Sequence, residues 1–403
     1  MKRCFLFLQG PDGVFFRKLG EKLKSLGHEV IRVNTTGGDF FDWPWPNAVS
    51  YRGRHVNWPA WIAKLMRERG VTDIFMLSEW RPRHIETADL AKNMGIQVHV
   101  FEEGYLRPYF ITLERDGVNG ASPLPRDAKT ILDLAAALPE PKPPLPLPSH
   151  FNNLARRTIY SLVARYALWP FWPFSKTHRP ISGFSEYVLG WLPRLPGIPK
   201  RRRLARERLG DLYASGKPFF LFPLQIDADA QIRRYSPFSS GMPEGICRVL
   251  TSFAAHAPQN CVLLIKNHPL DYGLINYGKY IDSMRQALNL GDRVIYVEDG
   301  DGDAMTRASL GLVTLNSTMG FTALQTGKPV YYLGRSIASF AGLGAALPAV
   351  RLEDFWKDPV GPEPALLAAF LKLVRHQALI NGDFHSPEGQ QLTIAGVLTS
   401  LGL

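Results

Sequence analysis

Strand and helix signals alternate through most of this sequence, and this alternation restricts the fold more than any other feature. In the first part, the expected strands are residues 2–8, 29–33, 73–77 and 96–101, and the expected helices are 14–26, 59–69 and 82–94. In the second part, strands are expected near 219–224, 261–265, 293–297, 311–315 and 329–333, and helices near 243–256, 277–289, 301–308 and 318–326. This βαβ rhythm is typical of a parallel sheet covered by helices, so it predicts an α/β protein.

A segment of different composition separates the two parts. Residues 139–148, PEPKPPLPLP, contain six prolines in ten and predict an extended connector, which opens a bridge over 139–208. We therefore expect a first Rossmann-like domain at 1–185, including part of this bridge, and a second at 209–375. A last helix within 376–403 is expected to pack back on the first domain. Two such domains facing across a cleft form the GT-B architecture, which glycosyltransferases share with some epimerases.

Length and composition favour a folded protein of the reducing cytoplasm. The 403 residues are enough for two α/β domains. The three cysteines, Cys4, Cys247 and Cys261, have neither CxxC nor metal-ligand spacing, so neither a disulfide framework nor a metal site is expected. A run of about 18 uncharged apolar residues does not occur, and a spanning helix is not expected. We expect a soluble or peripheral protein.

Loops after the strands are the candidate sites, because ligands of open α/β sheets bind beyond the carboxyl ends of the strands. The first strand is followed by a turn with Gly10 and Pro11, and the second by a polar loop with Gly37, Gly38 and Asp39. Glycines at such positions allow backbone N–H groups to approach an anion. An ordinary tight turn is the alternative for the first loop.

The strand that ends near Phe101 leads into two adjacent acids. Glu102 and Glu103 are followed by a glycine and then by Arg107. This composition favours an active-site loop. The alternative is that one of the acids only pairs with Arg107.

Strand ends in the second part carry a further group of polar residues. They are Gln225 and Asp227, then Lys266, His268 and Pro269, and finally Asn316, Ser317 and Thr318. Hydroxyl and N–H groups at a helix start, with cations on a neighbouring strand, suit a nucleotide phosphate. Ser317 and Thr318 are also ordinary helix N-cap residues. Likewise, Asp227 could serve only as a helix or turn cap.

The order of these motifs resembles capsule polysaccharide biosynthesis proteins of the KpsS type. The matching stretches are LFLQGPDGVFFRKLG, NTTGGD, RPRH, EEGYLRP, GVNGAS, QID, KNHPLD and NSTMGFTALQTGKPV, which extend over most of residues 1–335. The resemblance implies a GT-B fold and places Arg81 and His84 of RPRH among the acceptor-side loops of the first domain. The NTTGGD stretch departs from the NGGD form of this family by carrying Thr35 and Thr36.

The resemblance further implies a retaining β-Kdo transferase that uses CMP-β-Kdo as its donor. The QxD and HP motifs of bacterial Kdo transferases match Gln225 with Asp227 and His268 with Pro269. Retention through two displacements requires a carboxylate nucleophile and a group that transfers a proton. We expect Asp227 to be the nucleophile and Glu103 the acid/base, with Glu102 as the alternative.

The donor carries a phosphate and a carboxylate, so the site needs positive partners. Lys266, His268 and Arg107 are the candidates. The strand-end residues of the second part complete the expected donor site. Neither a metal nor a cofactor is expected, because these donors and a helix start can stabilise a monophosphate leaving group.

Positive charge is concentrated in the bridge. Between Arg156 and Arg208, twelve Lys and Arg residues face two acids, out of a formal net charge of +11 for the chain. Aromatic residues accompany them, and such a segment could lie in a membrane interface. Nucleic-acid binding and packing at an interdomain hinge are the alternatives. The residues predicted to contact the membrane are Arg156, Arg157, Arg165, Trp169, Trp172, Arg201, Arg202 and Arg203.

The combined expectation is an enzyme of capsule assembly on the inner face of the cytoplasmic membrane. It transfers Kdo to a lysophosphatidylglycerol acceptor and starts a poly-Kdo linker. The resemblance implies a second, chain-extending Kdo transferase and the capsule exporter as partners, and no nucleic acid. Two alternatives stay open: a GT-B glycosyltransferase or epimerase for another nucleotide sugar, and a non-catalytic capsule-export component.

Overall fold

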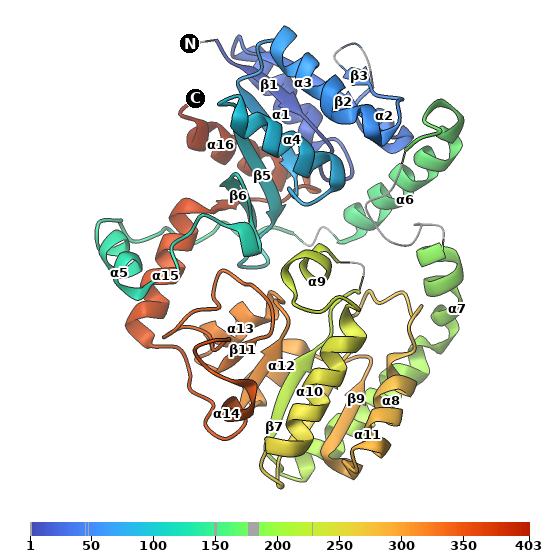
Figure 1. Ribbon diagram of the computed structural model, residues 1–403, viewed down its shortest axis with the longest axis vertical. Helices are drawn as coiled ribbons and strands as arrows, with labels where there is room; N and C mark the ends of the chain where they lie inside the picture. The colour runs from blue at the N-terminus through green and yellow to red at the C-terminus, as the bar shows by residue number, and fades with distance from the viewer. Residues whose placement is uncertain (1, 45, 47, 149–150, 176–184, 228) are drawn as a thin grey trace. The chain divides into compact units, whose positions relative to one another are not determined.

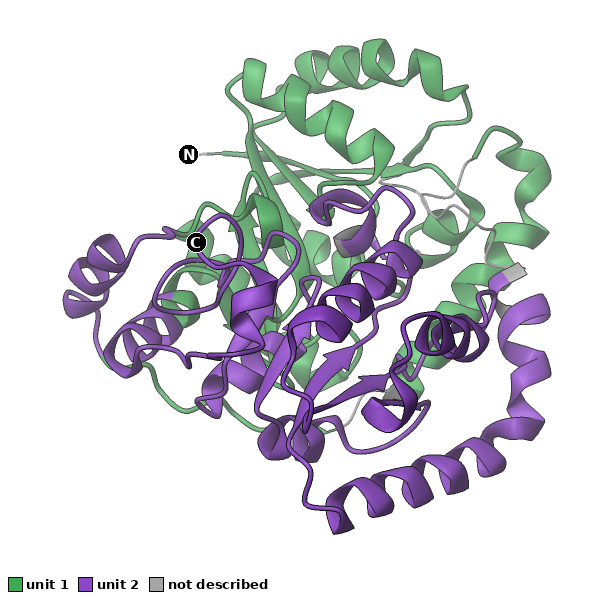
Figure 2. Cartoon of the chain, turned by 60° about the horizontal axis from the view of Figure 1, so that its bottom comes forward, with its two compact units in different colours: residues 1–124, 140–178, 374–403 green, residues 125–139, 179–373 purple. Residues whose placement is uncertain are grey.

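The chain divides into two compact units in the computed structural model (Figures 1 and 2). Unit 1 comprises residues 1–124, 140–178 and 374–403, and unit 2 comprises residues 125–139 and 179–373. The structure describes residues 2–44, 46, 48–148, 151–175, 185–227 and 229–403. Part of the predicted bridge, residues 176–184, lies outside the described residues.

Unit 1 contains a seven-stranded sheet in the order β12-β6-β5-β4-β1-β2-β3. Its strands are β1 (Cys4–Phe7), β2 (Glu29–Asn34), β3 (Ala48–Ser50), β4 (Asp73–Leu77), β5 (Gln97–Glu103), β6 (Phe110–Arg115) and β12 (Leu379–Asn381). β1 to β5 form parallel pairs, whereas β6 runs antiparallel to both β5 and β12. The carboxyl ends of β1, β2, β4 and β5 therefore share one edge of the sheet.

Helices cover both faces of this sheet (Figure 1). Those of unit 1 include α1 (Phe15–Ser25), α2 (Gly37–Asp42), α3 (Trp58–Glu68), α4 (Pro82–Asn93), α6 (Phe151–Ala167) and α16 (Pro387–Leu401). Successive strand side chains point to opposite faces. Phe5 and Phe7 accordingly pack with α1 and α16, while Leu6 packs with α3 on the other face. The last helix thus belongs to the core of unit 1.

Unit 2 contains a five-stranded parallel sheet in the order β11-β10-β7-β8-β9. Its strands are β7 (Phe219–Pro223), β8 (Val262–Lys266), β9 (Val294–Val297), β10 (Gly311–Thr314) and β11 (Val330–Tyr332). Phe220 and Phe222 of β7 pack with α10 on one face of the sheet. The strands are apolar along most of their length, as expected for a parallel sheet buried on both faces.

The helices of unit 2 connect these strands and extend the unit. They include α5 (Ala128–Ala136), α7 (Leu192–Arg194), α8 (Ile198–Ala214), α9 (Ala230–Tyr235), α10 (Met242–His256), α11 (Tyr277–Ala287), α12 (Gly302–Ala308), α13 (Met319–Gln325) and α14 (Leu352–Phe355). α15 (Pro364–Gln377) contains the boundary with unit 1. The predicted α/β class with two Rossmann-like units, as in a GT-B protein, is confirmed.

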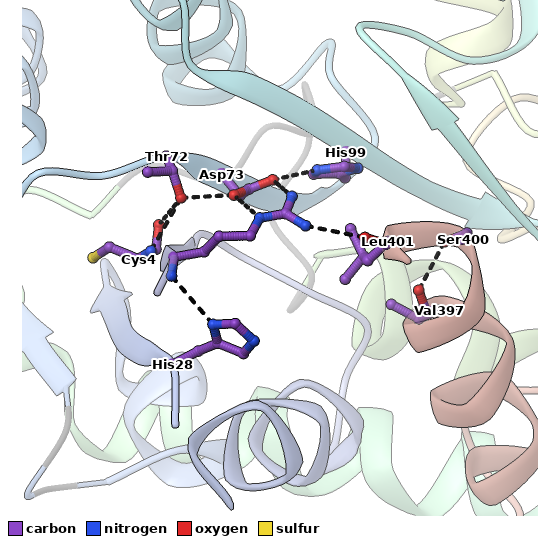
Figure 3. Close-up of polar contacts among 9 residues, drawn as sticks. Cys4, His28, Thr72, Asp73, His99, Val397, Ser400 and Leu401 are labelled. Carbon is purple, nitrogen blue, oxygen red and sulfur yellow. Dashed lines mark hydrogen bonds and ion pairs between the residues drawn. The ribbon is translucent and has the colours of Figure 1, made fainter. Parts of the chain in front are cut away.

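A buried polar network ties together the amino ends of the strands in unit 1 (Figure 3). Asp73, the first residue of β4, forms a bidentate ion pair with Arg3. It also accepts hydrogen bonds from Thr72 (2.7 Å) and from His99 Nε2 (2.8 Å). Arg3 Nη1 donates to the carbonyl oxygen of Leu401, at 3.2 Å, and so connects β1 to the end of α16.

The proline-rich connector has no regular secondary structure. Residues 139–148 form no helix or strand, as the prolines predict. In the part of the chain that the structure describes, every helix is too short or too polar to cross a membrane.

Candidate functional site

The strand ends of unit 2 bring three predicted residue groups to one edge of the sheet. β7 lies between β10 and β8, so the loops that follow these three strands are neighbours. Gln225 Nε2 donates to Asn316 Oδ1 at 3.0 Å, and the Asn316 N–H donates back to Gln225 Oε1 at 3.2 Å. Both side chains are buried. Gln225 therefore fixes the loop after β7 to the loop after β10, and its contact with a donor stays a prediction.

Asp227 sits beside the start of α10. Its Oδ1 accepts a hydrogen bond from the Met242 N–H at 2.7 Å, and its Oδ2 pairs with Arg233. Arg233 Nε also donates to the Asp227 carbonyl oxygen at 2.9 Å. A Cβ on Gly241 would lie 2.1 Å from Asp227 Oδ1, so the absence of a side chain there lets the carboxylate reach the helix. The capping alternative is thus realised, while the nucleophilic role stays a prediction.

Lys266 and His268 line a cavity of about 310 Å³, which also includes Asn267 and Pro269. Lys266 is buried, and burial lowers the pKa of its ammonium group. Its Nζ donates to the Asn267 carbonyl oxygen at 3.1 Å. The volume is at the lower end of the range for small-molecule sites. This cavity, called the unit 2 cavity below, is large enough for a compact anionic ligand.

Basic residues of the bridge also line the unit 2 cavity. Arg194 and Arg201 both pair with Glu298, the latter with Nε 3.2 Å from Oε2. Arg202 pairs with Asp299 at 3.1 Å. All five residues line the cavity. Arg201 and Arg202 therefore line a cavity, whereas the sequence analysis predicted only that they contact a membrane.

Glu298, Asp299 and Arg194 were missed by the sequence analysis. The acids follow β9 directly, in the stretch EDGDGD, and reading that strand end would have found them. Arg194 carries no such signal, because only the tertiary fold brings it to the end of β9. Arg203 instead lies 3.6 Å from Glu207, one turn along α8, and is exposed.

Ser317 and Thr318 precede α13. Ser317 Oγ accepts a hydrogen bond from the Met319 N–H at 3.2 Å, while Thr318 occupies the N-cap position without a side-chain cap bond. The capping alternative therefore holds for Ser317. Donor binding by either hydroxyl stays a prediction.

In unit 1, the turn with Gly10 and Pro11 lines a space of only about 10 Å³. This volume corresponds to a single water molecule. Asp42 lies in the same wall, and its Oδ2 accepts from the Gly13 N–H at 3.0 Å. Burial raises the pKa of Asp42 to about 7. The enclosed space favours the tight-turn alternative for Gly10 and Pro11.

The second predicted loop of unit 1 has structural contacts throughout. Asp39 pairs with Arg32 at 3.1 Å, and its other oxygen accepts from the Thr35 N–H and hydroxyl at 3.0 and 2.9 Å. Burial alone would raise the pKa of Asp39, but Arg32 and Thr35 lower it overall. Thr36 caps α2 by accepting from the Asp39 N–H. Both threonines of the NTTGGD stretch therefore hold Asp39 in place.

Gly37 and Gly38 allow α6 to approach α2. A Cβ on Gly37 would lie 2.6 Å from the Ala164 carbonyl oxygen, and one on Gly38 would lie 2.6 Å from Ser161 Oγ. Close helix packing therefore explains both glycines. Ligand contact by this loop stays a prediction.

The RPRH stretch follows β4 and opens α4. Ser78 has a left-handed backbone conformation with φ of 61°, which is uncommon for a residue with a side chain. Its carbonyl oxygen lies 2.6 Å from Nδ1 of the buried His84. Burial, with a contribution from Arg81, lowers the pKa of His84 to about 3, so the ring is neutral and Nδ1 carries the proton.

Glu102 and Glu103 lie within β5, which extends to Glu103 rather than ending at Phe101 as predicted. The reason is the antiparallel neighbour β6, which pairs Ile111 with Glu103. Glu102 Oε1 accepts from the Glu103 N–H at 3.1 Å. In the described ranges, no ion pair joins Arg107 to either acid. Asp227 belongs to unit 2, so its meeting with Glu103 in one site stays a prediction.

Comparison with known proteins assigns the chain to a family. Residues 72–385 match the family described as capsule polysaccharide biosynthesis protein. The chain belongs to this family. It is 33% identical over 391 residues to the capsule polysaccharide modification protein LipB of Neisseria meningitidis serogroup A, covering 94% of this chain and 91% of LipB. It is 32% identical over 394 residues to the capsule polysaccharide export protein KpsS of Escherichia coli, covering 94% and 96%.

Solved structures also resemble this family member. The Thermosulfurimonas dismutans KpsC, beta Kdo 2,7 transferase, has a TM-score of 0.48 and 15% identity, covering 99% of this chain and all of that one. The S. aureus MnaA-UDP co-structure has a TM-score of 0.33 and 10% identity, covering 100% and 98%. These values assign no activity. The predicted resemblance to KpsS-type proteins is confirmed by the sequence matches.

The bridge of the family member presents both buried and exposed rings. Trp169 is exposed, together with Tyr160 and Phe171. Trp172 is buried, with its ring centroid 5.6 Å from that of Phe40 and beneath the guanidinium of Arg52. The prediction that Trp172 contacts a membrane is therefore wrong, because the ring packs within unit 1.

Among the described residues, no group of three His, Cys, Asp or Glu side chains is arranged to hold a metal ion.

Proposed function

We propose that this member of the capsule family is a retaining β-Kdo transferase. It moves Kdo from CMP-β-Kdo to a glycerol hydroxyl of (lyso)phosphatidylglycerol and so starts the poly-Kdo linker of a capsular glycolipid. The observation that supports this most is the edge of unit 2 where the QID loop and the KNHP loop follow adjacent strands. That edge belongs to a chain 32% identical to KpsS over 94% of its length.

The donor would occupy the unit 2 cavity. Lys266 supplies a buried ammonium group beside it, and His268 supplies an imidazole. Arg194 and Arg201 add positive charge that Glu298 partly neutralises. A monophosphate and a sugar carboxylate are the anions that such a wall can bind, and the leaving CMP needs no metal on this account.

Two displacements give retention with Asp227 as the nucleophile. First, a carboxylate oxygen bonds to the anomeric carbon of Kdo while that carbon's bond to the phosphate oxygen breaks, and CMP leaves with the electron pair. Next, the glycerol oxygen attacks the same carbon, Asp227 is released, and the hydroxyl proton passes to Glu103 or Glu102. Each oxygen of Asp227 already accepts a bond, yet a carboxylate oxygen has two lone pairs, so one remains for attack.

The acceptor would be reached at the inner face of the cytoplasmic membrane. Ile159, Tyr160, Val163 and Tyr166 are exposed on α6, and Arg156 is exposed on the same helix. Apolar and aromatic side chains flanked by cations suit an interface that contains anionic lipid. A chain-extending Kdo transferase and the capsule exporter are the proposed partners.

The test combines product formation with trapping of the intermediate. Purified protein is incubated with CMP-Kdo and a fluorescent lysophosphatidylglycerol, and we expect a product heavier by one or more Kdo residues with a β linkage by NMR. In Glu103→Gln, intact-mass analysis should show Kdo attached to Asp227, and Asp227→Asn should prevent both product and adduct.

Two results would reject the proposal. Activity with a UDP-sugar but none with CMP-Kdo would favour another GT-B transferase or an epimerase. Normal capsule formation in cells that carry a folded Asp227→Ala protein would favour a non-catalytic export component.

A further inference from the structure

Among the described residues of unit 1, four arginines contain buried hydrogen-bond donors without acceptors: Arg17, Arg81, Arg165 and Arg375. Of these, Arg81 follows β4, and Arg165 lies on α6, which packs on α2. Nε and Nη1 of Arg81 and Nε of Arg165 are inaccessible to solvent, and in the described part of the chain they have no hydrogen-bond partner. Each residue as a whole is half-buried. Leaving charged donors unbonded is costly in a folded protein. This pattern is typical of a site that a ligand completes.

The two arginines belong to elements at the same edge of the sheet. Arg165 belongs to α6, which packs on α2 through Gly37 and Gly38, and Arg81 precedes α4 at the same edge of the sheet. Burial, with a smaller contribution from the positive charge of Arg165, lowers the pKa of Arg81 to about 10. Asp39 acts electrostatically on both arginines. The two like charges therefore act on each other at this edge of the sheet.

Acids of this region do not neutralise the pair. Asp39 already accepts three hydrogen bonds, from Arg32 and from the N–H and hydroxyl of Thr35. Asp12 and Glu102 influence the pKa of Arg81 from a distance, but in the described ranges neither forms an ion pair with it. An additional anion could supply the hydrogen bonds that the buried donors of Arg81 and Arg165 lack.

We propose that Arg81 and Arg165 bind the phosphodiester group of the acceptor headgroup, an inference that rests on the proposed function. A phosphodiester offers two unbridged oxygens, and the fork of N–H donors on each guanidinium matches this geometry. α6 also explains how a lipid arrives. Ile159 and Val163 are exposed on one side of this helix, whereas Ser161 and Ala164, next to Arg165, face α2. One helix thus combines a lipid-facing side with a phosphate-binding residue.

Binding can be tested without donor or turnover. The full-length protein is titrated by calorimetry with glycerophosphoglycerol, the water-soluble headgroup, and separately with inorganic phosphate. We expect glycerophosphoglycerol to bind and inorganic phosphate to bind at least tenfold more weakly. Arg81→Gln and Arg165→Gln should each weaken the first affinity about 10-fold to 100-fold, the range for a lost charge-assisted hydrogen bond. The matched control is Arg67→Gln, an exposed arginine of α3, which should bind like the wild type.

Turnover separates a phosphate contact from a general defect. Arg165→Gln should lower kcat/KM for lysophosphatidylglycerol by a similar factor and leave the slower reaction with uncharged monoacylglycerol unchanged. Its thermal unfolding temperature should not fall, because the substitution removes an unbonded buried charge. A purely structural arginine would lower activity with both acceptors and lower the unfolding temperature.

The outcomes distinguish this inference from the proposed function. Unchanged headgroup binding in both arginine variants, or equal loss with both acceptors, would overturn the inference while the transferase proposal stands. Tighter binding of inorganic phosphate than of glycerophosphoglycerol would overturn the assignment to a lipid headgroup. Arginine-dependent headgroup binding without turnover of CMP-Kdo would retain the anion site and reject the transferase.

Discussion

Unit 1 carries two buried polar clusters at opposite edges of the same sheet, and they differ in how completely their bonds are made. At the amino edge, Asp73 accepts four hydrogen bonds from Arg3, Thr72 and His99, two on each oxygen (Figure 3). At the carboxyl edge, Arg81 and Arg165 retain buried donors without partners in the described part of the chain. Both clusters contain buried charged groups, but only at the amino edge does the central charged group make all of its hydrogen bonds.

The difference indicates that the two edges of the sheet have different roles. Four bonds are the full capacity of a carboxylate, so the amino-edge cluster has nothing left to offer a ligand and acts on stability. The carboxyl edge is where ligands of α/β sheets bind, and its incomplete bonds lower stability until a ligand supplies them. Removing a charge should therefore have opposite consequences at the two edges.

The largest effect is expected at the amino edge. Asp73→Ala leaves Arg3 and His99 facing each other without their shared acceptor, and breaking such a buried pair costs about 3–5 kcal/mol. Urea denaturation of the full chain measures this loss. Thr72→Val is the control within the cluster: it removes one of the four bonds to Asp73, together with the hydroxyl's bonds to the Cys4 backbone, and should cost about 1–2 kcal/mol. Equal losses in the two variants would contradict the cooperative network.

The parallel framework could be predicted from sequence, because each strand of unit 2 is a short apolar run that needs no partner to be recognised. β12 could not, since its three residues, Leu379–Asn381, become a strand only by pairing with β6, more than 260 residues earlier. A separate pairing with β6 extends β5 over Glu102 and Glu103. Strands of this kind depend on tertiary contacts, and a local pattern does not reveal them.

The candidate site could likewise be predicted only in part from the sequence. Strand-end reasoning located Lys266 and His268, which do line the unit 2 cavity. It offered a cap as the alternative role of Asp227 but did not identify α10 as the helix, because this depends on the left-handed glycine at 241, with φ of 73°. It also assigned Arg201 to a membrane, although the acid that pairs with it, Glu298, lies nearly 100 residues further along the chain. Side-chain pairing across elements requires the fold.

A second prediction concerns Asp42, the acid with a raised pKa at the carboxyl edge. Its pKa of about 7 exceeds the unfolded value, so the unfolded state releases its proton first and stability falls as pH rises from about 4 to 7. Asp42→Asn removes this loss and can raise the free energy of unfolding at pH 8 by as much as about 4 kcal/mol. Denaturation of both proteins at pH 5 and pH 8 measures the difference. Asp39→Asn is the contrasting control, because it weakens the pair with Arg32 and should destabilise at both pH values.

A third prediction concerns Asp73 at the amino edge, where stability should fall as the pH is lowered. Burial raises the pKa of Asp73, but hydrogen bonds from His99, Arg3 and Thr72 lower it to about 2. The folded pKa therefore lies below the unfolded value, so the stabilisation is present above about pH 4 and is lost as pH falls through 2. About 2–3 kcal/mol of the acid-induced loss should depend on this group. The free energy of unfolding of the wild type and of Asp73→Asn is measured between pH 5 and pH 2.5, and the difference between the two gives the contribution of Asp73. A difference that does not change with pH would contradict the lowered pKa of Asp73.

The smallest expected effect is the most informative for the comparison. Arg165→Met at the carboxyl edge keeps an apolar stem of similar length and removes a buried donor without a partner. The free energy of unfolding should therefore change by less than about 1 kcal/mol, and we expect a small gain in stability. Arg3→Met removes a charge of the same kind from the completed cluster and should cost several times more, because Asp73 remains buried. Parallel urea titrations of the two variants compare the edges directly. A loss in Arg165→Met as large as that in Arg3→Met would mean that the carboxyl-edge arginine stabilises the fold, and the distinction between a completed cluster and a ligand-binding one would not hold.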